Sequence, residues 1–338
     1  MNNKYKNYHP LRVFSWSHEE EKTTDQLLVE NTVMEWYASK HRKVSEDEIN
    51  FINSIEIQKC PFCNSTHIIK NGHRNDGMQR YRCITCNKRF IPLTNTIFDS
   101  HKIPISEWIE YLLHLFEYHS IKSSAYDNRN VSSTGTYWLR KVFEVLKGIQ
   151  DDIMLDGTIY LDETYIPKIQ HETVTKDGKK LRGISRNKLG VCVATNGKTT
   201  IYLASGTSKP SKKSTLRTYG KHIIPGSTII HDEEHSHKVL IDKLNLTSIV
   251  YPASETKGLK DEDNPLYKVN HQHTLLKKFM KEHGGFDRKQ LQDWMNLFWF
   301  IQNGPTDRYD KVLTFIKLAI VSPKRMKYRS VMSKKDGD

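Results

Sequence analysis

The stretch Thr158-Ile-Tyr-Leu-Asp-Glu-Thr-Tyr-Ile166 constrains the fold of this chain more than any other. Ile159, Leu161 and Glu163 fall on one side of it, which is the spacing of a β-strand. Asp162 falls on the other side, at the middle of the predicted strand. Because an unpaired buried carboxylate is costly, Asp162 is expected to be paired or bound to a metal, unless it is a hydrogen-bonded structural residue at a strand end.

The residues that follow continue this strand into a sheet. The hydrophobic spacing predicts two more strands in an antiparallel meander, then helix, strand, helix, strand and helix. This order matches an RNase H-like α/β fold with a mixed five-stranded sheet, in which the first and fourth strands lie side by side. The predicted elements after the first strand span residues 189–194, 200–204, 211–222, 227–232, 236–244, 247–251 and 265–283.

The fourth predicted strand ends in Asp232, so this topology would place its carboxylate beside that of Asp162. Two adjacent carboxylates cannot both remain ionised without a cation. Hard oxygen ligands suit Mg²⁺ or Mn²⁺. Two such ions would activate a water or a 3′-hydroxyl at a phosphodiester and stabilise the leaving oxygen. We therefore predict a catalytic divalent-metal site at these two residues.

The predicted helix 265–283 carries a second polar group. Asn270, His273 and Lys277 are spaced by three and four residues, so their side chains cluster along one side of the helix. His273 also falls on the apolar stripe of this helix, where a hydrogen-bonded core histidine is the more common outcome. The pattern makes these three residues candidates without fixing their roles.

Two Cys-x-x-Cys pairs give the sharpest local signal. Cys60 and Cys63 are separated by 19 residues from Cys83 and Cys86. Two such pairs supply the four thiolates of a tetrahedral Zn²⁺ site, and turn residues between them are typical of a zinc ribbon. A redox-active pair is the competing interpretation. A site closed by four cysteines leaves no position for substrate, so the zinc would be structural.

The charge of the chain indicates a polyanionic partner. Its 338 residues include 52 Lys and Arg against 39 Asp and Glu, which gives a net charge of +13 and an isoelectric point near 9.3. Nucleic acid is the commonest partner of so basic a protein, although a basic protein without such a partner is the alternative. Basic residues within the predicted ribbon are expected to contact DNA phosphates (Arg74, Arg80, Arg82, Lys88 and Arg89).

Two helices are expected between the ribbon and the first strand, one after Pro104 and one from Ser132. They are consistent with a helix-turn-helix or with a helical hairpin that links two domains. Lys141 lies off the apolar face of the second helix. The expected regions are an N-terminal helical region (1–57), the zinc ribbon (58–92), the helical DNA-binding region (104–150), the catalytic domain (155–304) and a basic C-terminal tail (305–338).

These residues together resemble bacterial insertion-sequence transposases of the DDE type, in the subgroup with an N-terminal zinc ribbon. The resemblance covers roughly residues 58 to 303, and its pieces are specific through their order and spacing. The pieces are Cys60-Pro-x-Cys63, Tyr81-Arg-Cys-x-x-Cys86, Thr96-Ile-Phe98 with Trp108, Leu161-Asp-Glu-Thr-Tyr165, Arg182-Gly-Ile-Ser-Arg186, His231-Asp232 and Val269-Asn-x-x-His-x-x-x-Lys277.

The resemblance implies that Asp162 and Asp232 bind the catalytic metals. Much of the wider family has Glu at the third position, where this chain has Asn270. An amide oxygen can bind a metal but brings no charge, so the metal affinity should be weaker than with Glu. Part of the zinc-ribbon subgroup has Asn at this position with Lys seven residues later.

That pattern leaves several roles open around the third position. Lys277 would hold a phosphate rather than a metal. His273 would bind the metal or orient a strand end, and Glu233 is a fallback third carboxylate.

The function implied is a DNA transposase. It would bind terminal inverted repeats, cleave double-stranded DNA at the element ends and transfer the 3′ strands to target DNA, as a homo-oligomer. Alternatives are a catalytically inactive DNA-binding protein or repressor derived from a transposase, and a stand-alone structure-specific nuclease. The sequence predicts no signal peptide and no membrane span, so a cytoplasmic, nucleoid-associated bacterial protein is expected.

Overall fold

A computed structural model describes residues 45–99, 104–128, 130–167, 188–284 and 286–328. The chain forms two compact units. Unit 1 contains the residues up to Val145 together with those from Pro305 onward, and unit 2 contains Leu146–Gly304. The motif Arg182-Gly-Ile-Ser-Arg186 and most of the predicted N-terminal helical region (1–57) lie outside the described residues.

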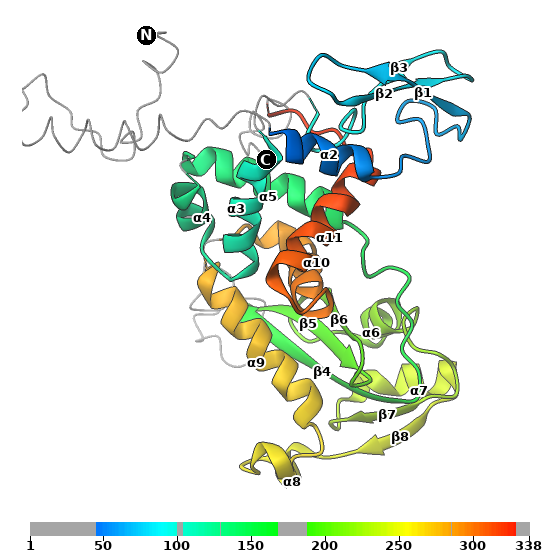
Figure 1. Ribbon diagram of the computed structural model, residues 1–338. Coiled ribbons are helices and arrows are strands. Elements are labelled where there is room, and N and C mark those ends of the chain that lie inside the picture. Colours follow the sequence, from blue (N-terminus) through cyan, green and yellow to red (C-terminus); the bar gives the residue numbers. More distant parts are fainter. Residues whose placement is uncertain (1–44, 100–103, 129, 168–187, 285, 329–338) are drawn as a thin grey trace, which may run out of the picture. The chain divides into compact units, whose positions relative to one another are not determined.

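Unit 1 begins with a short helix and a small sheet. Helix α2 (Glu46–Ser54) starts at the cap Ser45, whose hydroxyl accepts a hydrogen bond from the backbone N–H of Glu48 at 3.1 Å. The sheet has the antiparallel order β1-β2-β3 (Figure 1). Its strands are Ile68–His73, Gln79–Cys83 and Arg89–Phe90. The core of this sheet is small (Cys60, Tyr81, Cys83 and Phe90), and a domain with so small a core usually needs a metal or another cross-link to be stable.

The helical part of unit 1 differs from the prediction in number. Three helices, α3 (Ile105–Phe116), α4 (Ile121–Asp127) and α5 (Ser132–Leu146), replace the two expected. The rings of Trp108 in α3 and Trp138 in α5 stack with centroids 4.2 Å apart, and both side chains are fully buried. Aromatic burial of this size supplies much of the packing free energy between the two helices.

Two expectations for unit 1 are corrected. Lys141 is buried rather than turned to solvent, and its ammonium donates a hydrogen bond to the carbonyl of Ile97. The segment expected as a tail contains helix α11 (Arg308–Val321), which packs on α3. Phe315 of α11 meets Phe116 with ring centroids 5.9 Å apart. The basic residues near the end of the chain favour a tail in the sequence, whereas the apolar residues before them form a helix with a buried face.

Unit 2 is built on the predicted mixed five-stranded sheet. The strand order is β6-β5-β4-β7-β8, with β4 central (Figure 1). β4 runs antiparallel to β5 and parallel to β7, so the predicted adjacency of the first and fourth strands is confirmed. β5 and β6 are antiparallel, and β7 and β8 are parallel. The strands are Thr158–Pro167, Lys188–Thr195, Thr200–Thr207, Thr228–His231 and Thr247–Val250.

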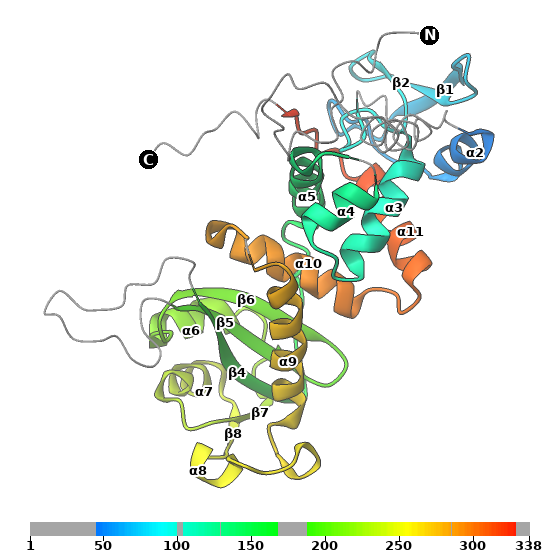
Figure 2. The ribbon, with the colours of Figure 1, turned by 90° about the vertical axis from the view of Figure 1, so that its left-hand side faces the viewer.

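Helices cover both faces of this sheet. Ile159 and Leu161 of β4 are fully buried in a core that also contains residues of α6 (Lys212–Tyr219) and α7 (Lys238–Leu244). The opposite face is covered by α9 (Tyr267–Glu282), which lies along β4 and β5, and by α10 (Leu291–Asn303), which packs on β6 (Figure 2). The described part of unit 2 also contains the short helix α8 (Ala253–Thr256) and 3₁₀ turns at His235–His237, Asp261–Asp263 and Arg288–Gln290.

Candidate functional site

The four predicted cysteines come together at one end of the ribbon. The Sγ atoms of Cys60 and Cys86 are 3.7 Å apart, and those of Cys63 and Cys83 are 3.6 Å apart. All four Sγ atoms lie within 4.8 Å of one another, and none is in a disulfide. These separations suit four thiolates around one tetrahedral ion.

The two cysteine pairs have the same backbone geometry. Asn64 and Asn87 each follow the second cysteine of a pair, with φ angles of 60° and 59°. Asn tolerates this left-handed conformation better than most residues, and it turns the chain so that both sulfurs of a pair face inward. The backbone N–H of Cys86 also donates to Sγ of Cys83 at 3.5 Å, which favours the thiolate. The donor set fits Zn²⁺ and is closed to substrate.

The two predicted aspartates lie at the same edge of the sheet of unit 2. Tyr160 of β4 pairs with Ile230 of β7, so Asp162 and Asp232 stand two residues further along two parallel neighbours. Backbone N–H groups hold both carboxylates: that of Glu163 donates to Asp162 at 2.7 Å, and that of Glu234 donates to Asp232 at 3.1 Å. Their side chains are 24% and 35% exposed, so both reach solvent at this edge.

Both carboxylates of this pair lie in surroundings that oppose their negative charge. Burial, followed by the charges of Asp232 and Glu163, raises the pKa of Asp162 to about 7. Burial likewise raises the pKa of Asp232 above its ordinary range. Two carboxylates held in this state gain from a nearby cation, because a cation compensates the charge that burial penalises. Their hard oxygen donors fit Mg²⁺ or Mn²⁺.

Helix α9 brings one of its three candidates directly to this edge. Nδ1 of His273 lies 3.8 Å from Oδ2 of Asp162, and the imidazole is buried. Burial, followed by the charge of Lys277, lowers the pKa of His273 to about 4, so the ring is neutral at physiological pH. Its Nε2 atom has no hydrogen-bond partner among the described residues. Asn270 is half-buried on the same helix and Lys277 is exposed.

Behind the aspartates lies a buried polar network that the sequence analysis did not predict. Oε1 of Glu163 is 3.2 Å from Nε2 of His237, whose Nδ1 is 3.0 Å from Nδ1 of His231. Nε2 of His231 is 2.9 Å from the hydroxyl of Ser248, and the hydroxyl of Tyr219 donates to Glu163 at 3.2 Å. The chain of contacts therefore runs from β4 through the segment after β7 to β8.

This network stabilises the carboxylate of Glu163, which β4 places in the core. Burial opposes a charge on His237, but the hydrogen bond and the charge of Glu163 outweigh it and raise the pKa of the imidazole. His237 also lies 3.8 Å from Asp232, so the same ring contacts both the buried and the exposed carboxylates. The signal was present in the sequence: Glu163 shares the side of β4 that carries Ile159 and Leu161, where an acid needs a partner.

The fallback carboxylate of the sequence analysis has no such contacts. Glu233 is exposed, whereas the neighbouring Glu234 pairs with Lys209 at 2.7 Å.

No membrane-spanning helix is found in the part of the chain that the structure describes.

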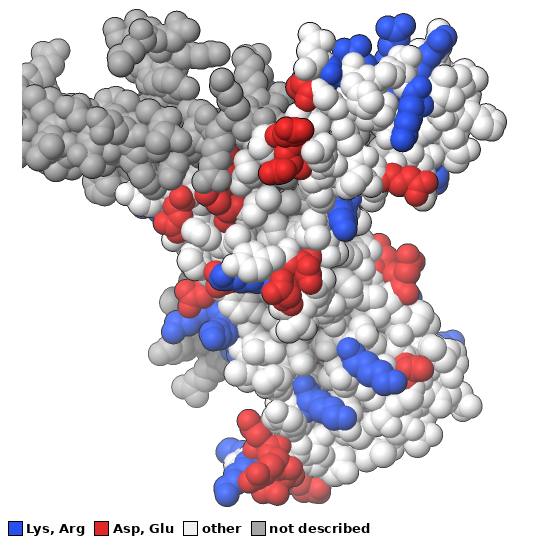
Figure 3. Space-filling model, viewed as in Figure 1, with Lys and Arg blue, Asp and Glu red and all other residues white. Residues whose placement is uncertain are grey.

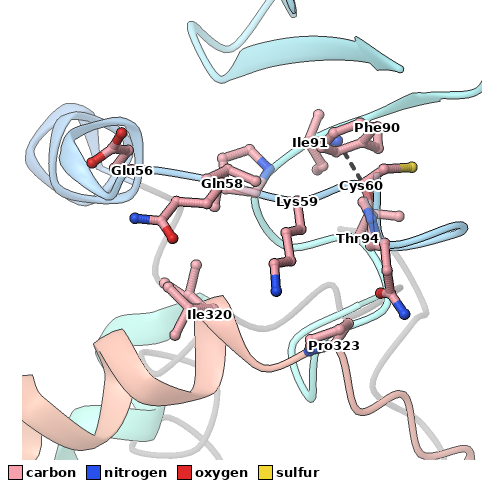
Figure 4. Close-up of a pocket in the computed structure, with 14 residues that line it drawn as sticks. Glu56, Gln58, Lys59, Cys60, Phe90, Ile91, Thr94, Ile320 and Pro323 are labelled. Atoms are coloured by element: carbon pink, nitrogen blue, oxygen red, sulfur yellow. Dashed lines mark hydrogen bonds between the residues drawn. The ribbon is translucent and has the colours of Figure 1, made fainter. Parts of the chain in front are cut away.

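A cavity of about 530 Å³ lies within unit 1, and it is separate from the aspartate site (Figure 4). Its wall combines the segment before the ribbon, the end of β3 and the last turn of α11, with Lys59 extending into it. None of its lining residues belongs to unit 2.

No family model and no curated protein matches the sequence. The chain is similar to a pre-cleavage Mos1 transpososome, at 13% identity over 68% of this chain and 82% of that chain, with a TM-score of 0.25. It is also similar to a simian T-cell lymphotropic virus intasome (8% identity, 56% and 67% covered, TM-score 0.28). A third similar structure is the Mos1 transposase catalytic domain with raltegravir and Mg (16%, 56% and 94%, TM-score 0.26). TM-scores of this size describe a partial likeness.

The cysteine cluster predicts a metal-dependent ribbon. Cys86→Ser should lose one bound Zn²⁺ per chain and leave residues 58–92 open to protease, because structural zinc supplies about 10–16 kcal/mol to such small domains. Zinc content and limited proteolysis of the full chain measure both effects. Cys192→Ser is the matched control, since Cys192 is buried in unit 2 outside the cluster, and it should retain the zinc. Equal zinc content in both variants would contradict the assignment.

The buried network predicts a change at His237. Glu163→Gln should lower the pKa of the His237 ring and cost about 1.5–3 kcal/mol of unfolding free energy, the scale of a hydrogen bond to a charged group. Ring-proton NMR across pH and urea unfolding measure the two effects. Glu234→Gln removes a partly exposed pair with Lys209 and should cost about 0–1 kcal/mol. An unchanged His237 titration in Glu163→Gln would refute the coupling.

The raised pKa of Asp162 predicts how stability depends on pH. A carboxyl whose pKa rises on folding binds protons better in the folded state, so in a buffer without Mg²⁺ or Mn²⁺ the unfolding free energy falls as pH rises from 3.8 to about 7. Asp162→Asn should remove this loss, at most about 4 kcal/mol at about 1.4 kcal/mol per pKa unit. Urea unfolding at several pH values between 3.8 and about 7 measures this loss, and Asp242→Asn, at an exposed aspartate on α7, is the control. Parallel curves for wild type and Asp162→Asn would exclude it.

Proposed function

We propose that this chain is a DDE-type DNA transposase with an RNase H-like catalytic domain in unit 2. The observation that carries the proposal is the pair Asp162 and Asp232 at the ends of adjacent parallel strands, with pKa values raised by burial. Carboxylates in that state are suited to bind divalent cations at neutral pH. Bound there, Mg²⁺ or Mn²⁺ would supply activation of an attacking oxygen and stabilisation of a leaving oxygen at a DNA phosphodiester.

The residues of α9 would complete the site. His273 is neutral and its Nδ1 lies 3.8 Å from Oδ2 of Asp162, so this ring is placed to bind the ion or to orient a strand end. Lys277 is exposed on the same helix, and a flexible ammonium suits contact with a phosphate. Asn270 would offer an amide oxygen in place of a third carboxylate, so this site would hold its cation with less charge than a three-carboxylate site.

Unit 1 would recognise the DNA. Lys and Arg side chains gather over the ribbon on the face shown in Figure 3. Arg82 of the ribbon is exposed and is held by a hydrogen bond from its Nε to Oδ1 of Asn87 at 2.7 Å, while Nζ of Lys88 lies 4.6 Å from the ring centroid of Phe62. Basic groups held in place in this way suit contacts to phosphates rather than to bases. The ribbon and the helices α3–α5 would bind terminal inverted repeats, and two copies of the chain would bring two ends together.

The proposal predicts metal-dependent cleavage and joining of DNA. Wild type with Mg²⁺ or Mn²⁺ should cut a duplex that carries the DNA flanking the coding region and join its 3′ ends to a target duplex. Asp232→Ala should lower the rate by about 10³-fold or more, since several kcal/mol of charge stabilisation would be lost. Asn270→Ala should lower it less. Asp242→Ala, an exposed aspartate on α7, is the control and should keep wild-type activity.

The other outcomes identify the alternatives. Binding of the flanking DNA without cleavage by wild type would support a repressor or other inactive DNA-binding protein derived from a transposase, for which Asn270 in place of an acid is the favouring observation. Cleavage without joining, at sites unrelated to inverted repeats, would support a structure-specific nuclease. Binding should weaken steeply with salt in each case, because the chain carries a net charge of +13.

A further inference from the structure

A second group of metal-ligating side chains lies in unit 1, at the junction of α3 and α4. His114 is in the last turn of α3, His119 is in the connection that follows, and Asp127 is the last residue of α4. One ligand atom of each residue lies within 4.8 Å of the others. Neither the four cysteines of the ribbon nor the aspartates Asp162 and Asp232 of unit 2 belong to this group.

Both imidazoles turn the same ring atom to one oxygen. Nδ1 of His114 is 3.2 Å from Oδ2 of Asp127, and Nδ1 of His119 is 3.8 Å from that oxygen. The two ring centroids are 4.9 Å apart with a tilt of 43°, so the rings do not stack. Ser123 donates its hydroxyl hydrogen to the same oxygen at 3.2 Å, which orients the carboxylate. Such outer hydrogen bonds commonly hold a metal ligand in place.

The contact between His114 and Asp127 is not a hydrogen bond. Nδ1 of His114 is buried and has no hydrogen-bond partner in the ranges that the structure describes, although the oxygen of Asp127 is 3.2 Å away. A ring N–H aimed at that oxygen would form a strong bond at this distance. The ring N–H of His114 is therefore not aimed at the oxygen of Asp127, although the two atoms are close. A separation of this size between two donor atoms also suits two ligands of one metal ion.

We propose that His114, His119 and Asp127 bind a divalent transition-metal ion of the Zn²⁺ type. Two imidazoles and one carboxylate suit Zn²⁺, Ni²⁺ or Cu²⁺ better than Mg²⁺, which prefers oxygen ligands. The three side chains are 31%, 41% and 37% exposed, so the group lies at the surface, where water would complete the coordination of a bound ion. This site is independent of the proposed transposase activity.

The ion would fasten the end of α3 to α4. The helix ends at Phe116, and Tyr118 in the connection has a φ angle of 70°, a conformation that costs free energy for a non-glycine residue. A metal bound on both sides of this connection stabilises it by binding only the folded state. Zn²⁺ would thereby stabilise the helical part of unit 1 as well as the ribbon.

The test compares metal stoichiometry in the full chain. After equilibrium dialysis against Zn²⁺, the double variant His114→Asn/His119→Asn and the single variant Asp127→Asn should each retain one Zn²⁺ fewer per chain than wild type. Titration with Co²⁺ separates the two sites of unit 1, because only the cysteines give a thiolate charge-transfer band. That band should be unchanged in both variants, which also shows that the ribbon is folded.

His271→Asn is the matched control, since His271 is an exposed histidine on α9 outside the group. It should retain the wild-type number of Zn²⁺ ions. Circular dichroism verifies that the helices of each variant are intact, and Asp127→Asn preserves the side-chain shape if the double variant is not. Equal zinc content in wild type and in a folded variant overturns the proposal.

Discussion

Two consecutive carboxylates in the central strand β4 impose the constraint on which unit 2 depends. Because side chains alternate along a strand, Asp162 and Glu163 project to opposite faces of the sheet. Glu163 enters the core, where His237 and Tyr219 satisfy it. Asp162 stays at the exposed edge beside Asp232, where burial and the neighbouring carboxylate raise its pKa and the charge of His237 offsets only part of that rise. The strand β4 thus carries Glu163, whose carboxylate has partners within the protein, and Asp162, whose carboxylate would gain from a bound cation.

Much of this fold could be predicted because its elements have local signals. The alternation in β4 and the order of strands and helices were enough to give the mixed sheet and the adjacency of β4 and β7. The errors arose where tertiary contacts outweigh local pattern. Lys141 has the spacing of a surface residue, yet a carbonyl and aromatic rings hold its ammonium inside. Helix α11 was missed because basic neighbours masked an apolar face that α3 covers.

The candidate sites show the same division. Spacing alone predicted the cysteine cluster, because each Cys-x-x-Cys turn fixes two sulfurs locally. The proximity of Asp162 and Asp232 followed from topology. The link from Glu163 to His237 crosses 74 residues of sequence and depends on the exact placement of a 3₁₀ turn, so no periodicity could reveal it. The roles of Asn270 and Lys277 depend on DNA and metal, and they stay proposals for that reason.

The division of the chain into units bears on how the protein is made. Residues on both sides of Leu146–Gly304 belong to unit 1, so unit 2 is an insertion within it. During synthesis, α3 emerges from the ribosome long before α11, whose Phe315 and Arg308 meet Phe116 and Glu117. Helix α5, which also packs on α3, is made before unit 2, but the part of α3 that α11 covers stays uncovered until the whole of unit 2 has been translated. Unit 1, which is begun first, can therefore be completed only after unit 2 has been made.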